Sequence, residues 1–435
     1  MELKDLERQY TRNLLKKKIH YAWVVCFGCA LMFFCTCGLS CNVFGVYSPF
    51  IMKQFGYSKT QISLINSGRS LSQILAVALA GKYYKKLKAR QGMLIAGALC
   101  AVGYIIYGFS ENLPLFLAGS FFVGFGYGLG AMIPISMILE RWFWKNRTLA
   151  VSLVSAASGL ATLGIPSLIT ANIEKRGMAY AFILEGVIML VLVFISFLII
   201  KNNPGDMSIQ AFGEKEAKTN AMYTAASADT EKKENRKYIS GKYWIVLYVM
   251  AVAATTFNSA GFNCLSMLVT TEGFDSATVA LSLSMAGFML MMGKFIFGIC
   301  STRFTQYKTS IAFGIVCTIS LFMCCFISLG KVMLYVSVGL YGGALSMYSV
   351  GQVSWLDEWA SPEERAEKLR LLQVIFAIGS LFVNFSSGVM ADAFGGSYIP
   401  FFILCAAGAA AVTFIVWYTY RKLRKENEQS FCDKR

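Results

Sequence analysis

Twelve apolar stretches alternate with short polar connections along the chain. A transmembrane helix needs about 20 consecutive apolar residues, and each stretch has about that length or more. The first six stretches lie near 20–47, 59–83, 91–110, 114–139, 146–172 and 177–200. The other six lie near 242–268, 276–301, 308–329, 332–357, 366–391 and 396–420. The pattern predicts an all-α membrane protein with twelve transmembrane helices in two six-helix bundles.

The polar segments predict the division of the chain. Residues 1–19 and 421–435 form charged tails, and residues 201–241 form a polar linker without an apolar period. The bundles are expected at 20–200 and 242–420. The first apolar stretch is too long for a signal-peptide core and has no evident small-residue cleavage site, so we expect an uncleaved first helix.

Composition agrees with this reading and excludes an ordinary soluble enzyme. Hydrophobic residues make up 56% of the chain and charged residues 15%, against roughly 25% charged residues in soluble domains. The net charge is +16, but 33 of the 40 Lys and Arg residues fall on the predicted side of the two termini and only five on the other. This asymmetry predicts cytoplasmic termini and explains the excess of basic residues without nucleic acid.

The two halves resemble each other at a spacing of 217 residues. Gly56 matches Gly273, Ser67 matches Ser284, and Gly81 matches Gly298. Two parallel halves of six helices joined by a cytoplasmic linker resemble the major facilitator superfamily, whose substrate site lies between the halves near the bilayer midplane.

Two loops carry partial versions of that family's Gly-x-x-x-acid-basic signature. One runs from Gly81 to Arg90 and the other from Gly298 to Arg303, but Lys85 and Thr302 stand where the family has an acid. The resemblance assigns a role in gating to Gly81, Lys86, Gly298 and Arg303. The missing acids mean that the family's latch at these loops is lost or lies elsewhere.

A second resemblance covers about half the chain. The run from Glu140 to Ala150, with Arg141-Trp142-Phe143 and Arg147, is followed by Gly159 and Gly164. It resembles bacterial oxalate–formate antiporters and related monocarboxylate porters, and it adds Arg141 and Arg147 to the gating residues.

Three charged residues lie inside predicted helices, where charge is costly and usually functional. Arg69 shares a helix face with Asn66, Ser70 and Gln73. Lys294 stands where the resembled family has an arginine that holds the substrate carboxylate. Glu185 lies in the sixth stretch. Structural hydrogen bonding for Arg69, snorkelling for Lys294 and helix pairing for Glu185 are the alternatives.

Polar side chains on predicted cavity helices complete the expected site. Each of these side chains could either contact the substrate or pack between helices. The candidate substrate-binding residues are Arg69, Lys294, Asn66, Gln73, Asn42, Tyr47, Tyr127, Asn258, Tyr341 and Tyr348, and Asn263 and Gln352 are further polar positions.

These features predict a secondary transporter of a small organic anion, most simply a monocarboxylate, driven by proton symport or anion exchange. Lys294 and Glu185 are the coupling candidates, because a lysine in an apolar site can release its proton whereas an arginine stays charged. An exporter of lipophilic drugs or cations, or a transport-dead sensor, is the alternative. We expect a monomer in the inner (plasma) membrane, no cofactor, no metal ion and no enzymatic activity; Cys26-x-x-Cys29 lies in an apolar helix without a second ligand pair.

Overall fold

The computed structural model describes residues 20–214, 242–351, 355–356, 359–361 and 364–432. In this part of the chain the only β-type contact is an isolated bridge between Phe143 and Phe212, and the rest of the regular structure is helical. The predicted N-terminal tail, residues 215–241 of the predicted linker, and Gln352 lie outside the described residues.

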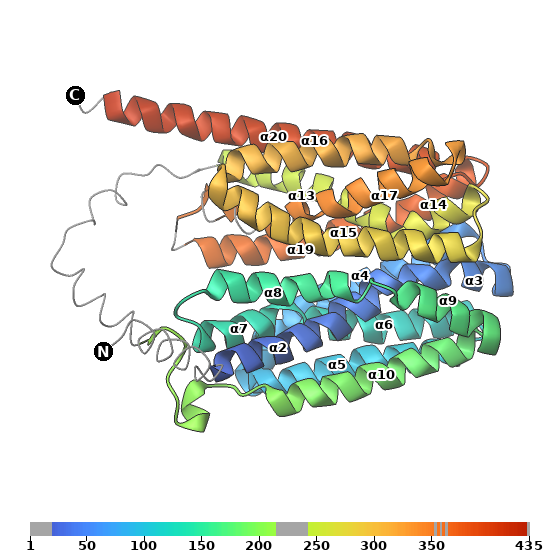
Figure 1. The fold of residues 1–435 in the computed structure, drawn as a ribbon, viewed down its shortest axis with the longest axis horizontal. Helices are drawn as coiled ribbons and strands as arrows, with labels where there is room; N and C mark the ends of the chain where they lie inside the picture. Colours follow the sequence, from blue (N-terminus) through green and yellow to red (C-terminus); the bar gives the residue numbers. More distant parts are fainter. Residues whose placement is uncertain (1–19, 215–241, 352–354, 357–358, 362–363, 433–435) are drawn as a thin grey trace, which may run out of the picture.

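The helices of the first half pack together in the lower part of Figure 1. They are α2 (Tyr21–Phe33), η1 (Phe34–Val43), η2 (Phe44–Val46), α3 (Tyr47–Phe55), α4 (Lys59–Lys86), α5 (Ala89–Gly108), α6 (Leu113–Gly130), α7 (Met132–Trp142), α8 (Arg147–Leu160), α9 (Ile165–Arg176) and α10 (Met178–Ile199). The segment η1 is a π-helix. Together α2, η1, η2 and α3 form one continuous helical run from Tyr21 to Phe55.

The helices of the second half pack in the upper part of Figure 1. They are α13 (Lys242–Asn263), α14 (Leu265–Thr271), α15 (Ser276–Arg303), α16 (Gln306–Cys324), α17 (Lys331–Ala344), η5 (Met347–Gly351), α19 (Arg365–Ala393) and α20 (Ile399–Cys432). Helix α20 continues beyond residue 420, where the sequence predicts a tail. The start of α2 and the end of α20 lie at the same end of the molecule, which we call the terminal face, and the other end is the opposite face.

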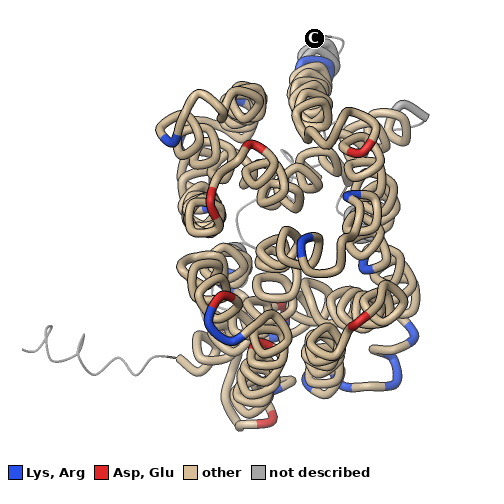
Figure 2. Tube along the Cα trace, turned by 90° about the vertical axis from the view of Figure 1, so that its right-hand side faces the viewer, with Lys and Arg blue, Asp and Glu red and all other residues tan. Residues whose placement is uncertain are grey.

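Eleven helical runs of the described residues are long and apolar enough to cross a membrane. Helix α4 is not among them, because polar and basic residues interrupt its apolar pattern, and the count of twelve spans stays a prediction. Large apolar side chains such as Phe194 and Phe382 are exposed on the outside of the bundles, and charged residues are sparse along the helices in Figure 2. A protein with this surface is a multi-pass membrane protein.

The repeat is confirmed at the bounds of its best-matched pair. Helices α4 and α15 both have 28 residues, and their first residues are 217 positions apart. Ser58 and Asp275 cap their N-termini with side-chain oxygens, as expected for these residue types. The turns before the caps need Gly56 and Gly273, which have φ angles of +65° and +87°.

The same close helix packing occurs in both halves. A Cβ atom on Gly124 of α6 would overlap the carbonyl oxygen of Arg69 on α4. In the second half, a Cβ atom on Gly342 of α17 would overlap the carbonyl oxygen of Ala286 on α15, and Ala286 is the repeat equivalent of Arg69. Small residues let membrane helices approach closely. Arg69 therefore lies at a close crossing of two helices, and its equivalent in the second half, Ala286, is uncharged.

Candidate functional site

Arg69 is buried in the first half, with 6% of its surface exposed. Its Nη1 donates to the carbonyl oxygen of Ser40 at 3.1 Å, and its Nη2 donates to Oδ1 of Asn66 at 3.2 Å. The guanidinium carbon also lies 5.3 Å from the centre of the Phe44 ring, a cation–π arrangement. Arg69 is thus oriented by residues of its own half, and it faces η1 and η2.

The π-helical segment η1 accounts for part of this arrangement. In a π-helix the backbone bonds connect residues five apart, and such turns are frequent at functional sites. Here the carbonyl oxygen of Ser40 accepts from Arg69, while the Ser40 hydroxyl donates to the carbonyl oxygen of Thr36. The segment therefore presents a backbone acceptor to a buried cation.

Lys294 on α15 is equally buried, with 6% exposed, but its partners belong to the other half. Its Nζ donates to the carbonyl oxygen of Ser155 at 2.8 Å, to Oγ of Ser155 at 3.3 Å and to Oγ of Ser158 at 3.1 Å. Both serines lie on α8. They are not among the residues predicted for the site, although serines at 152, 155 and 158 form a visible stripe at helical spacing.

The two cations flank one segment of the first helix. The Cys37 thiol on η1 lies close to Lys294, Ser158 and Tyr127, and Tyr127 is in turn a neighbour of Arg69. Asn42 donates to the carbonyl oxygen of Ser158 at 3.1 Å.

The exposure of this region indicates where a ligand could enter. Cys37, Asn42 and Tyr127 are half-buried in an otherwise closed interior, and so is Gln73, one turn beyond Arg69 towards the terminal face. The structure thus brings together Arg69, Lys294, Asn66, Asn42 and Tyr127 from the predicted site.

Neither cation is paired with an acid in the part of the chain that the structure describes. Among the described residues, neither Arg69 nor Lys294 has a carboxylate oxygen within salt-bridge distance, whereas Arg147 at the terminal face pairs with Glu140 at 3.3 Å. Two buried positive charges from opposite halves therefore remain uncompensated around η1. An arrangement of this kind attracts an anion, because a buried charge without a partner is costly.

Glu185 lies deeper in the first half. The Tyr47 hydroxyl donates to its Oε2 at 2.7 Å, and the Tyr47 ring stacks on Phe182 with centroids 3.8 Å apart. The other oxygen, Oε1, has no hydrogen-bond partner in the described structure. Tyr47, a predicted substrate ligand, is thus placed beside Glu185 and is absent from the contacts of Arg69 and Lys294.

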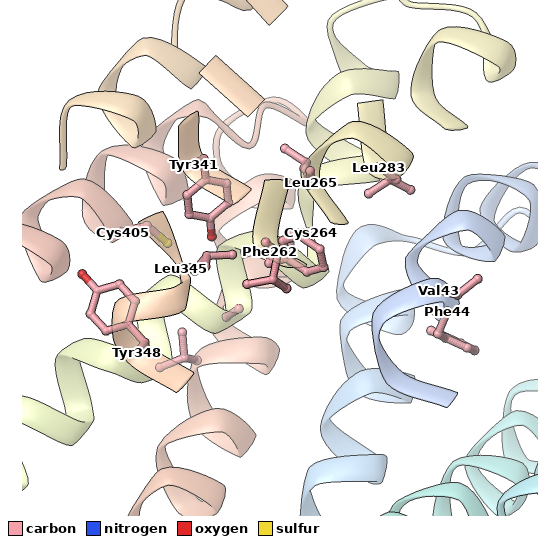
Figure 3. Packing of buried hydrophobic residues seen from close by; sticks show 14 of the residues in the cluster. Val43, Phe44, Phe262, Cys264, Leu265, Leu283, Tyr341, Leu345, Tyr348 and Cys405 are labelled. Carbon is pink, nitrogen blue, oxygen red and sulfur yellow. The ribbon is translucent and has the colours of Figure 1, made fainter. Parts of the chain in front are cut away.

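Three predicted substrate ligands lie within the second half. The Tyr341 hydroxyl donates to the carbonyl oxygen of Asn258, whose own Nδ2 donates to the carbonyl oxygen of Ala254 at 2.9 Å. Tyr348 is buried near Cys317. Figure 3 shows Tyr341 and Tyr348 in the packing of this half, across from Val43 and Phe44 of the first helix. The structure does not bring these three residues to the two cations.

The predicted gating residues lie at the terminal face. Lys86 and Arg303 end α4 and α15 at equivalent positions, and no atom lies within 4 Å of a Cβ built on Gly81 or Gly298. Arg141 donates to Asn203 at 3.3 Å within the first half. The repeat relates Gly81 and Lys86 to Gly298 and Arg303, whereas Arg141 and Arg147 bond to Asn203 and Glu140.

In the described structure, the contacts between the halves include a hydrogen bond from the Ser266 hydroxyl to the carbonyl oxygen of Gly45 and two larger sets. The first, which we call the hydroxyl seam, joins α4 to α19. At the opposite face, the amide and hydroxyl of Thr60 donate to Asp392 at 2.9 and 2.6 Å. Hydroxyl contacts continue the seam inwards as Ser63–Ser387 at 3.2 Å, Ser67 to the Leu381 carbonyl at 3.2 Å and Ser70–Ser380 at 3.4 Å. None of these pairs is among the predictions from the sequence.

The second set, which we call the lysine seam, joins α8 and α9 to α15. It starts at the opposite face, where Ser276 donates to Glu174. It continues through small residues, because a Cβ atom on Gly287 would overlap Thr162 and one on Gly159 would press on Met291. It ends at the three hydrogen bonds of Lys294.

Comparison with known proteins agrees with this architecture. The chain is 23% identical over 336 residues to the oxalate:formate antiporter of Oxalobacter formigenes, covering 71% of this chain and 73% of that protein. It is 22% identical over 167 residues to monocarboxylate transporter 12 of Mus musculus, covering 38% of this chain and 34% of the other. The matched segment thus spans about a third of that second relative.

The fold itself matches solved transporters. The partially occluded inward open xylose transporter XylE from E. coli superimposes with a TM-score of 0.71 at 13% identity, covering 92% of this chain and 99% of that one. The model of the Major Facilitator Superfamily matches residues 28–351. With three quarters of its length matched by that family model and its helices arranged as in a solved transporter, the chain belongs to the Major Facilitator Superfamily.

Proposed function

We propose that this transporter carries a small organic anion, a monocarboxylate in the simplest case, between its two halves by alternating access. The observation that carries the proposal is the pair of buried, unpaired cations, Arg69 and Lys294, which approach η1 from opposite halves. A carboxylate that enters this region loses its water, and the two cations would compensate its charge. The similarity to an oxalate:formate antiporter supports an anionic substrate.

The buried acid does not favour the alternative of a cation or drug exporter. A cationic substrate would need a carboxylate facing it, but Glu185 is covered by Tyr47 and Phe182 inside the first half. Glu185 therefore stays a candidate for coupling only. We also propose that the terminal face is cytoplasmic, as the distribution of basic residues favours, in a twelve-span protein of the inner (plasma) membrane.

The test is counterflow in proteoliposomes with radiolabelled mono- and dicarboxylates, with and without a pH gradient. We expect monocarboxylate accumulation that Arg69→Gln abolishes. Arg176→Gln is the matched control, because Arg176 is an exposed arginine stacked on Tyr180 at the opposite face. Cation transport, or anion transport unchanged in Arg69→Gln, would contradict the proposal.

Coupling is tested separately with Lys294→Arg. If Lys294 carries the proton, arginine preserves exchange between two loaded states but removes uptake driven by a pH gradient, because arginine stays charged. If the protein is an obligate exchanger, a pH gradient drives no net uptake even in the parent. Full pH-driven uptake by the variant excludes Lys294 as the proton carrier and leaves Glu185 to be neutralised next.

A further inference from the structure

The lysine seam ends at a contact that a carboxylate could replace. Lys294 donates three hydrogen bonds, and all three acceptors belong to Ser155 and Ser158 on α8. No described hydrogen bond between the halves lies closer to the terminal face. An ammonium group has three protons to donate, so these bonds use its full capacity and leave none for a ligand.

The depth of the contact explains why it matters for opening. Lys294 lies 18 residues into α15, about 27 Å from the start of the helix at 1.5 Å per residue. Hydrogen bonds of the hydroxyl seam reach only to Ser70, about 17 Å into α4. Among the described hydrogen bonds between the halves, the one nearest the terminal face therefore involves Lys294, a cation of the candidate site. The hydroxyl seam ends at a bond between two neutral serines.

We propose that Ser155 and Ser158 hold Lys294 as a tie between the halves, and that the carboxylate of the substrate displaces these serines when it binds. The inference rests on the proposed function and extends it to residues of α8. Neutral hydroxyl and carbonyl acceptors bind an ammonium less strongly than a carboxylate does. Substrate binding thus breaks a cross-half contact, which links occupancy of the site to separation of α8 and α15.

Because the serines compete with the substrate for Lys294, removing them should increase the affinity for the anion. The double variant Ser155→Ala/Ser158→Ala removes two acceptors and keeps the backbone carbonyl of Ser155. We expect the anion to bind about threefold to tenfold more tightly, because less competing interaction must be broken. Serines that bound the substrate directly would give weaker binding instead. Ser152→Ala, one turn away on α8, is the control, and we expect it to leave the affinity for the anion unchanged.

A second readout reports the tie without any substrate. Cys37 lies beside Ser158 and Lys294, so separation of α15 from α8 uncovers its thiol. Purified protein is treated with a maleimide, and Cys37 modification is followed by peptide mass spectrometry. We expect faster labelling in the double variant than in the parent and in Ser152→Ala.

The two readouts separate the possible failures. Anion binding, measured by titration calorimetry with acetate, formate and oxalate, should tighten together with faster Cys37 labelling. Unchanged labelling, or weaker anion binding in the double variant, overturns the tie. Faster labelling without anion binding in any variant shows that the tie exists, but it overturns displacement by a carboxylate and the proposed function with it.

Discussion

The two seams between the halves use different chemistry for the same task. The hydroxyl seam spreads neutral hydrogen bonds over the first twelve residues of α4, with one carboxylate, Asp392, at its outer end. The lysine seam relies on close packing at Gly159 and Gly287 and on one ammonium group at its inner end. A ligand can compete for a single charged group far more readily than for a series of small contacts. Both seams reach the opposite face, but of the two only the lysine seam ends at a charged group for which an anion can compete.

The largest expected effect comes from removing the cation near the inner end of each seam. Arg69→Gln and Lys294→Gln should each lower anion transport about 100-fold or more, because each removes a desolvated partner of the anion, equivalent to about 3 kcal/mol. Lys294→Gln also removes a contact between the halves, whereas the described hydrogen bonds of Arg69 stay within its own half. Cys37 labelling should therefore rise in Lys294→Gln and stay unchanged in Arg69→Gln. Equal labelling of the two variants would remove the distinction between the seams.

A smaller but still strong effect is expected from packing in the lysine seam. Gly287→Ala would place a methyl group on Thr162, and overpacking of this kind costs about 1–3 kcal/mol. We expect a lower melting temperature in detergent and reduced exchange. Gly298→Ala is the matched control for stability on the same helix, because its Cβ would meet open space. Equal melting temperatures for the two variants would show that α8 and α15 are not closely packed in solution.

The hydroxyl seam should respond to loss of the Asp392 carboxylate. Asp392→Asn weakens the acceptor for the amide and hydroxyl of Thr60, and hydrogen bonds to charged groups contribute about 1.5–3 kcal/mol. We expect a stability loss at or below the lower end of this range, because the region is exposed. Cys37 labelling should be unchanged, since the lysine seam is intact. Increased labelling would mean that the two seams open as one unit.

The smallest effect concerns the start of the lysine seam at the opposite face. The hydroxyl and amide of Thr278 donate to Asp275, and these bonds hold the pKa of that exposed carboxyl below its ordinary value. A depressed pKa stabilises the folded state at neutral pH, and this contribution is lost as the pH falls through the folded pKa. Melting temperatures measured from pH 7 down to pH 3 should therefore fall slightly less in Asp275→Asn than in the parent. A steeper fall of the melting temperature in Asp275→Asn than in the parent would contradict a stabilising role for the Asp275 carboxylate.

The sequence predicted the parts of the molecule that depend on local pattern. The apolar stretches and the 217-residue repeat follow from residue spacing, and the structure confirms the matching bounds of α4 and α15. Arg69 and Lys294 stood out because charge in an apolar helix is rare. These signals need no knowledge of which helices are neighbours.

The rest depended on tertiary contacts that one sequence does not reveal. Tyr47 and Asn258 were expected near the substrate because their helices commonly line the cavity, but the side chain of Tyr47 faces Glu185 and that of Asn258 bonds to its own helix. Serines are common in membrane helices, so the helical spacing of Ser155 and Ser158 did not identify them as partners of Lys294. The angle at which a helix presents its side chains decides these cases.

The π-helical segment η1 has a consequence for how the first helix can vary. Its wider turns hold more residues than an α-helix over the same rise, so loss of one residue between Phe34 and Val43 could restore α-helical geometry there. Each residue of an α-helix turns the chain by about 100°. Such a deletion would rotate α2 against η2, so the face now shared with α8 would point to another neighbour. A one-residue deletion in this segment should therefore keep the first helix continuous but change which side chains of α2 face α8.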